Sequence, residues 1–115
     1  MHRDYRLYLD DILEAIDRIN EYVRGMDDEA FGSDRKTQDA VVRNLEVIGE
    51  ASRNLSDELK ALSDDIEWSK IIAFRNILVH EYFGVSIPIV WDIILNKLDP
   101  LRKACTKLLK QLEKA

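Results

Sequence analysis

The sequence has very few of the residues that make tight turns and cross-links. Among 115 residues there are four glycines, two prolines and one cysteine, Cys105. A strand-rich domain of this size needs many turns, so the shortage of glycine and proline argues against a β-sandwich or a barrel. A lone cysteine forms no internal disulfide, which excludes the disulfide-stapled secreted folds and predicts a cytoplasmic, reducing compartment.

Long apolar runs and an excess of basic charge are also missing. No segment approaches the roughly 20 apolar residues of a membrane helix, and the charged first residues do not resemble a signal peptide, so we expect no membrane contact. The 17 Lys and Arg against 22 Asp and Glu give a formal net charge of −5, which argues against coating nucleic acid by bulk charge. The length predicts one domain over residues 1–115.

Most motifs of cofactor and metal chemistry are absent as well. There is no glycine-rich phosphate loop, and one cysteine cannot build a thiolate zinc site. His80-Glu81 begins like a zincin motif, but the residue four positions after His80 is Gly84. Four carboxylates share one helical face without the Glu-x-x-His spacing of a di-metal bundle site, so we interpret them as a solvated surface: Asp10, Glu14, Asp17 and Glu21. We therefore expect neither a metal nor a cofactor.

The chain does have helical periodicity. Apolar residues recur at spacings of three and four in residues 9–26, 41–62, 68–82 and 87–98, and again in residues 101–113. The first pattern stops at Gly25, and residues 27–33 are typical of a loop. In the second segment, the small residues Ala51 and Ser52 indicate a place where another helix can approach.

The ends of the later helices have recognisable capping residues. Residues 63–65 supply N-cap chemistry for the third helix, and Ser86 with Pro88 opens the fourth. Asp99-Pro100 indicates an N-cap followed by a first helical residue, so we expect a break or kink there. Since short polar loops favour antiparallel neighbours, the predicted fold is all-α: an antiparallel up-and-down four-helix bundle with a broken or kinked C-terminal helix.

One helical segment, residues 74–84, places polar chemistry among large apolar side chains. At about 100° per residue, Arg75, Val79 and Tyr82 share one edge of the helix, and Asn76 and His80 share an adjacent edge. Arg75 and His80 are about 140° apart on such a helix, so they meet only if the helix end unwinds or a second subunit contributes.

These residue types fit metal-free cleavage of RNA. Arginine is a permanently charged donor suited to phosphate, and histidine can take and give a proton near neutral pH. In such a reaction the histidine activates the ribose 2′-OH while the arginine holds the phosphate and its developing charge.

The same residues also have simpler interpretations. A core histidine bonded to a backbone carbonyl is common, and Asn76 can cap the helix or orient His80. Tyr82 can be a core aromatic residue with its hydroxyl at the surface. Cys105 lies among leucines, and we interpret it as a small core residue rather than a nucleophile.

Residues 75–82 match an R-x4-H-x-Y motif, and through it the chain resembles the HEPN domains, in particular the HepT toxins once called DUF86 proteins. Residues 40–51, which include the run Ile48-Gly49-Glu50-Ala51, are similar to the second-helix signature of that family, and residues 68–84 are similar to its third helix. The resemblance extends over nearly the whole chain. It implies a small helical bundle that forms a homodimer and acts as the ribonuclease toxin of a type VII HEPN–MNT toxin–antitoxin pair.

The resemblance also implies roles for individual residues. Arg75 and His80 are then the catalytic pair, Asn76 is a supporting polar residue, and the substrate is RNA, either tRNA or mRNA. Tyr82 is the hydroxyl that the partner, a minimal nucleotidyltransferase (MNT), adenylylates. We expect helices around the third segment, including Trp68, to form part of the dimer interface. The alternatives are a non-catalytic subunit that binds a nucleotidyltransferase and, third, a purely structural helical domain.

The acidic residues are unevenly distributed along the chain. They concentrate in residues 4–34 and 57–67, and from Glu67 to the end there are only five, Glu67 included. The last helix carries five basic residues against Glu113: Arg102, Lys103, Lys107, Lys110 and Lys114. A small, local RNA site in the second half is therefore compatible with the negative net charge.

Overall fold

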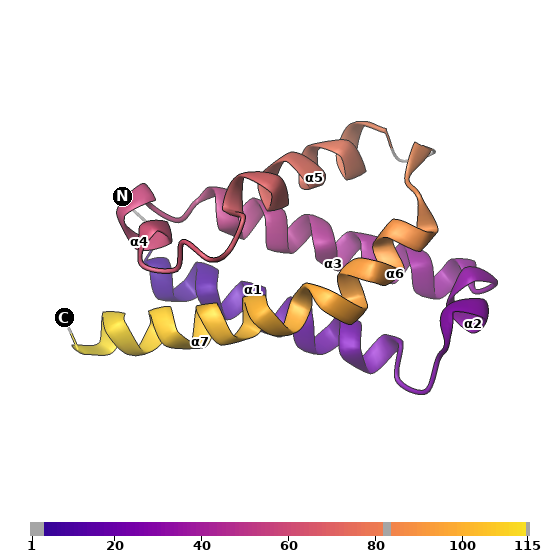
Figure 1. Cartoon of the computed structure of the whole chain (residues 1–115), viewed down its shortest axis with the longest axis horizontal. Coiled ribbons are helices and arrows are strands. Elements are labelled where there is room, and N and C mark those ends of the chain that lie inside the picture. The colour runs from indigo at the N-terminus through magenta and orange to yellow at the C-terminus, as the bar shows by residue number, and fades with distance from the viewer. Residues whose placement is uncertain (1–3, 82–83, 115) are drawn as a thin grey trace.

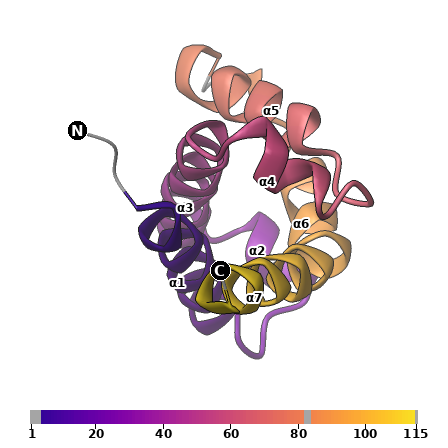
Figure 2. The same cartoon turned by 90° about the vertical axis from the view of Figure 1, so that its left-hand side faces the viewer.

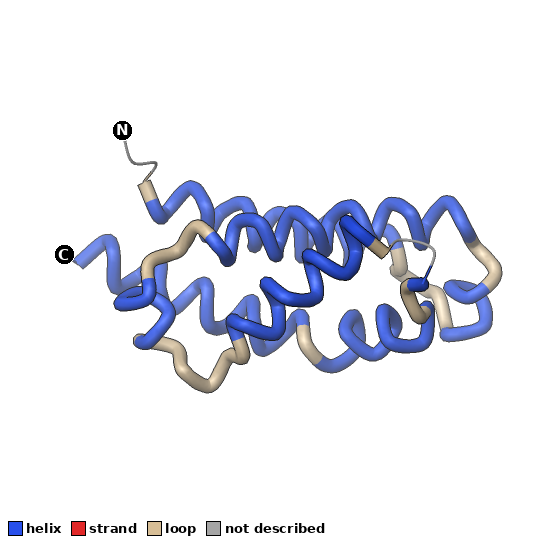
Figure 3. The backbone as a smooth tube through the Cα atoms, turned by 90° about the horizontal axis from the view of Figure 1, so that it is seen from above, coloured by secondary structure: helices blue, strands red, loops and turns tan. Residues whose placement is uncertain are grey.

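The computed structural model of the chain describes residues 4–81 and 84–114, and every regular element within them is a helix (Figures 1 and 3). This confirms the all-α prediction. The described residues form seven helices. The first three are α1 (Tyr5–Tyr22), α2 (Asp28–Gly32) and α3 (Arg35–Arg53). The others are α4 (Asp57–Ala61), α5 (Trp68–His80), α6 (Ile87–Asn96) and α7 (Leu98–Lys114).

Four long helical stretches run alternately in opposite directions, as expected for an up-and-down bundle: α1, α3, α5, and α6 continued by α7 (Figure 1). Helix α1 packs against α3 and α7, while α5 packs on α3 (Figure 2). The apolar stripe of α1 is fully buried at Leu9, Ile12, Ile16 and Ile19, and its acidic face is exposed. None of the described helices combines the length and apolar content needed to cross a bilayer.

Two short helices were not predicted from the sequence. The loop predicted for residues 27–33 contains α2, because the Asp27 carboxylate accepts a hydrogen bond from the Ala30 backbone N–H at 2.8 Å and caps the turn. Phe31 anchors α2 by stacking on Trp91 of α6, with ring centroids 5.0 Å apart. Helix α4 begins after the N-cap Ser56, so the second predicted helix ends at Arg53 and not near residue 62.

The predicted N-cap of the third helix was wrong. Helix α5 begins after Glu67, whose side chain makes no capping bond. Ser63 is buried, and its backbone carbonyl accepts a 3.0 Å hydrogen bond from the Trp68 indole N–H. Residues 63–65 therefore fix the entry into α5 through tryptophan packing and not through a side-chain cap.

The break in the last helical stretch lies two to three residues earlier than predicted. It falls at Lys97, between α6 and α7, and Pro100 lies in the first turn of α7. Proline is tolerated there because the first backbone N–H groups of a helix have no partner within the helix. Ser86 does cap α6, as predicted, by accepting a hydrogen bond from the Ile89 N–H.

Candidate functional site

Arg75 lies where α5 crosses α3 at very short range. A Cβ atom added to Gly49 of α3 would overlap the Cβ of Arg75 and lie 2.7 Å from its Cγ. Only glycine, which has no side chain, permits the two helices to approach this closely. The contact places the aliphatic stem of Arg75 directly on the α3 backbone.

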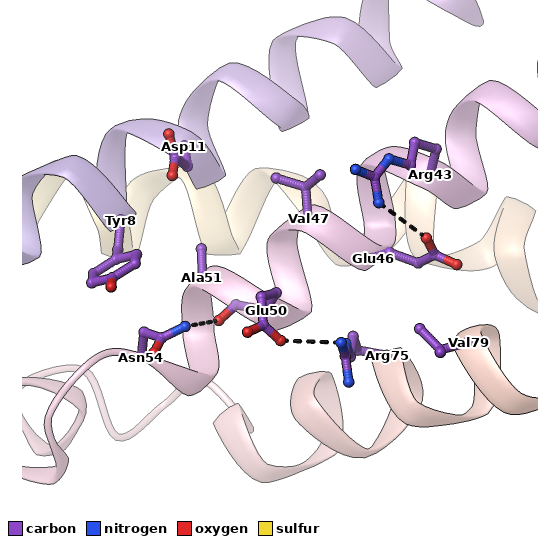
Figure 4. Close-up of a pocket in the computed structure, with 10 residues that line it drawn as sticks. All are labelled: Tyr8, Asp11, Arg43, Glu46, Val47, Glu50, Ala51, Asn54, Arg75 and Val79. Carbon is purple, nitrogen blue, oxygen red and sulfur yellow. Dashed lines mark hydrogen bonds and ion pairs between the residues drawn. The ribbon is translucent and has the colours of Figure 1, made fainter. Parts of the chain in front are cut away.

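The guanidinium group of Arg75 has two partners. Its Nη2 atom forms an ion pair with Glu50 Oε2 at 3.2 Å (Figure 4). Its Nη1 atom donates to Asn76 Oδ1 at 3.1 Å. The Arg75 side chain is only 24% exposed, and its Nε atom is buried with no hydrogen-bond partner among the described residues. Arg75 is therefore held by α3 instead of extending freely into solvent.

Beside Arg75 lies a groove of about 220 Å³, lined by residues of α1, α3 and α5 (Figure 4). Val79 lines it together with Arg75, so the predicted helix edge is confirmed for these two residues. The charged lining residues are three carboxylates and two arginines: Asp11, Glu46, Glu50, Arg43 and Arg75. Because carboxylates outnumber arginines in this lining, the groove repels a phosphate that approaches from the side of α1.

His80 is the last residue of α5 and is exposed. The helix continues through it, and the Glu81 backbone N–H donates to the Ile77 carbonyl at 2.8 Å. Within residues 4–81 and 84–114, neither the ion pair nor the hydrogen bond of the Arg75 guanidinium involves His80. Of the two ways in which Arg75 and His80 could meet, unwinding of the helix before His80 is therefore not observed.

The remaining predicted residues have mixed outcomes. Asn76 is exposed and accepts the hydrogen bond from Arg75, so its contact is with the arginine and not with His80. Tyr82 lies outside the described residues. Trp68 is buried within the chain at 6% exposure, which makes it a core residue and leaves little of its side chain for a dimer interface.

Cys105 is a core residue, as predicted. It is fully buried, and burial raises the pKa of its thiol to about 12, so it is not a nucleophile at neutral pH. In the described part of the chain, no group of three His, Cys, Asp or Glu residues is arranged to hold a metal ion. The carboxylates of the α1 face are exposed, which confirms the solvated-surface interpretation.

Sequence reasoning missed the contribution of α3 to this site. It placed the close helix approach at Ala51 and Ser52, which are indeed buried, but the tight contact with α5 is at Gly49. Glu50, the partner of Arg75, lay inside the run Ile48-Gly49-Glu50-Ala51 that carried the family resemblance. That run was the available signal.

A second, apolar groove of about 480 Å³ separates α5 from the α6–α7 stretch. Its apolar lining comes from α3, α5, α6 and α7 and includes Ile48, Ile71, Phe74, Ile93 and Leu101. Further apolar side chains of α5 and α6 are exposed, from 41% to 60%: Val79, Ile77, Ile89 and Leu95. An apolar surface of this kind is typical of a protein contact.

Comparison with known proteins identifies the relatives of this chain. A family model described as "Ribonuclease HepT-like" matches residues 12–108. A protein of Thermococcus cleftensis named "Probable ribonuclease HepT" is 41% identical, and the match covers 96% of this chain and all of that protein. A "Putative RNase" of Methanocaldococcus jannaschii is 38% identical over 96% of this chain and 92% of the relative. No solved structure matches the chain.

Proposed function

The chain belongs to the HepT-like ribonuclease family, and from this premise we propose that it is an endoribonuclease that cleaves RNA with Arg75 and His80. The family match over residues 12–108 carries the proposal, because it spans both the motif helix α5 and the helix α3 that holds Arg75. The part-buried guanidinium and the exposed imidazole at the end of the same helix support it.

The proposed reaction uses the ribose 2′-OH as the nucleophile. His80 takes the proton from this hydroxyl, and O2′ attacks the phosphorus while the P–O5′ bond breaks. The products are a 2′,3′-cyclic phosphate and a 5′-OH end, the latter protonated by an imidazolium. Arg75 donates to the non-bridging phosphate oxygens, which gain charge in the transition state.

We propose that the site is completed in a homodimer. Helix α5 is intact, so Arg75 and His80 of one chain project in different directions, and the His80 of a second copy can face the Arg75 of the first. The apolar groove and the exposed apolar residues of α5 and α6 give such a copy a surface to cover. Two histidines at one site would also supply both the base and the acid of the reaction.

The toxin–antitoxin role is part of the same proposal. We place the protein in the cytoplasm as one HEPN-like domain and as the toxin of a type VII pair, with an MNT antitoxin that adenylylates Tyr82. Tyr82 follows His80 by two residues, so an added AMP would bring bulk and negative charge to the place where the RNA phosphate must bind. The competing proposal is a non-catalytic subunit bound to a nucleotidyltransferase.

Cleavage of purified total tRNA by wild-type protein and by Arg75→Ala and His80→Ala tests the ribonuclease proposal. We expect both variants to lose cleavage while their helical circular dichroism stays unchanged. Arg18→Ala removes an exposed arginine of α1 and serves as the matched control that keeps activity. Cleavage that persists in either site variant contradicts the mechanism, and a wild-type protein that binds the MNT partner but never cleaves RNA favours the alternative.

The modification is tested separately by mass spectrometry. Incubation with the MNT partner and ATP should add AMP to Tyr82 and stop cleavage, whereas Tyr82→Phe should stay unmodified and active. AMP found on another residue, or full cleavage by the Tyr82-modified protein, contradicts this part of the proposal.

A further inference from the structure

We propose that Gly49 and Glu50, here called the Arg75 support, position the guanidinium of Arg75 for phosphate, so that Glu50 is a positioning residue of the site. This inference rests on the proposed role of Arg75 in RNA cleavage. It also gives a physical function to the run Ile48-Gly49-Glu50-Ala51, which carries no catalytic residue of its own.

The two residues of the support act on different parts of the arginine. Gly49 lets the Arg75 stem lie on the α3 backbone, which restricts the first bonds of the side chain. Glu50 then fixes the far end through the 3.2 Å ion pair to Nη2. Because Arg75 is only 24% exposed, this pair is less screened by water than a fully exposed pair.

Glu50 has further contacts within its own helix. Its Oε1 atom lies 3.7 Å from Arg53 Nη2, and its Oε2 atom, which faces Arg75, is buried. Asn54 donates from its side-chain amide to the Glu50 backbone carbonyl at 2.8 Å (Figure 4). Glu50 thus bridges an arginine of its own helix and the arginine of α5.

The occupied donors leave enough of the guanidinium for a phosphate. Nη1 and Nη2 each carry two N–H groups; Asn76 Oδ1 accepts from one N–H of Nη1, whereas the contact of Nη2 with Glu50 Oε2 is an ion pair without a hydrogen bond. At least one N–H on each terminal nitrogen therefore remains for a phosphate, which arginine can bind through two parallel hydrogen bonds. A guanidinium fixed in this way loses little freedom when the substrate binds.

A positioning role predicts an effect on the rate of the chemical step more than on RNA binding. Without Glu50 the guanidinium keeps its charge but loses its orientation, and misplacement of a catalytic group by about 1 Å can lower a rate by up to ~10²-fold. Loss of a negative charge beside the phosphate should, if anything, tighten RNA binding. We expect Glu50→Ala to lower kcat by about 10- to 100-fold with KM unchanged or lower, and Glu50→Gln to retain part of the rate.

Glu46 offers a matched control on the same helix. It lines the same groove one turn away, but it pairs with Arg43 at 3.5 Å and not with Arg75. Glu46→Ala therefore removes the same charge from the groove and leaves the Arg75 support intact. We expect its kcat to stay within about twofold of wild type. Equal losses in the Glu46 and Glu50 variants would show a general charge effect and overturn the proposal.

The test combines single-turnover cleavage with an NMR measurement of the Arg75 side chain. The Nε–H resonance of Arg75, assigned by its loss in Arg75→Ala, should be sharp in wild type and in Glu46→Ala and broadened in Glu50→Ala. Arg75→Ala with Glu50→Ala should be no slower than Arg75→Ala alone, because Glu50 acts only through the arginine.

The outcomes separate this inference from the proposed function. If Arg75→Ala cleaves as fast as wild type, the proposed function fails, whatever Glu50 does. If Arg75→Ala is inactive and Glu50→Ala cleaves at the wild-type rate, the ribonuclease proposal stands and the positioning role is overturned. If wild type is inactive, an Nε–H signal that is unchanged in Glu50→Ala overturns the positioning role on its own.

Discussion

At the scale of single residues, the shape of the Arg75 side chain matters as much as its charge. Arg75→Lys keeps the positive charge but replaces a planar fork by a point charge, which cannot contact Glu50, Asn76 and a phosphate in fixed directions. We expect the cleavage rate of Arg75→Lys to fall by at least about tenfold, measured under single-turnover conditions on a labelled tRNA. A rate close to that of wild type would mean that charge alone is sufficient.

Cys105 permits a test of the core at the same scale. Because burial raises the pKa of its thiol to about 12, the reactive thiolate is scarce at pH 8 and its fraction grows only as the pH approaches that value. We expect iodoacetamide at pH 8 to leave Cys105 unmodified in the folded protein and to modify it fully in concentrated denaturant. Rapid labelling of the folded protein, followed by mass spectrometry, would contradict the placement of α7.

The relative positions of site residues could be predicted from the sequence only where the residues lie on the same helix. The shared edge of Arg75 and Val79 follows from the angle between successive residues of a helix, and the groove confirms it. The Glu50–Arg75 pair depends on where α3 crosses α5, and helical periodicity holds no information on that crossing. The small residues Ala51 and Ser52 predicted a close approach on α3, but neither its position at Gly49 nor the residue that it contacts.

At the scale of helices, the contact between α3 and α5 is the part of the site that a substitution disrupts most easily. Gly49→Ala should destabilise the protein by about 1–3 kcal/mol, because the added methyl group overlaps the Arg75 stem and forces α5 away. Urea unfolding followed by circular dichroism measures this change, and cleavage should fall with it.

Gly32 provides the control for this substitution. It ends α2, and a Cβ atom added there has no neighbour within 4 Å. Gly32→Ala should therefore leave the free energy of unfolding within about 0.5 kcal/mol of wild type. Equal stabilities of the Gly49 and Gly32 variants would contradict the close approach of the two helices.

Helix boundaries were predictable where capping chemistry is local and unpredictable where packing decides. Ser86 caps α6 as its sequence indicates. Helix α2 forms in a segment typical of a loop because Phe31 packs on Trp91, a residue far away in the sequence. The break falls at Lys97 and not at Pro100, and Pro100 alone does not decide its position, since proline fits both before and within a first helical turn.

At the scale of the whole molecule, the charges are divided between the two halves of the chain. Residues 1–67 hold nine Lys and Arg against 18 Asp and Glu, whereas residues 68–115 hold eight against four. In α7, Arg102 pairs with Asp17 and Lys103 with Asp99, while Lys107 and Lys110 are exposed. Residues 68–115, which include Arg75, are thus the more basic part of the sequence.

The proposed homodimer makes a prediction about the exposed apolar surface of α6. Leu95 is 60% exposed, so Leu95→Glu should leave the fold intact but place a charge in the proposed interface. We expect sedimentation equilibrium at micromolar concentration to show wild type as a dimer and Leu95→Glu as mostly monomer. Leu7→Glu, at a 47% exposed position of α1, is the control that should stay dimeric. A monomeric wild type would contradict the dimer.

The most direct test of the proposed ribonuclease is end-group analysis of one cleaved RNA, prepared with ribose or with 2′-deoxyribose at the cut nucleotide. The proposed chemistry predicts a 2′,3′-cyclic phosphate and a 5′-OH from the all-ribose RNA, no cut in the deoxy-substituted RNA, and neither product with His80→Ala. Cleavage of the deoxy-substituted RNA at the same position, or products with a 5′-phosphate, would contradict the role given to His80.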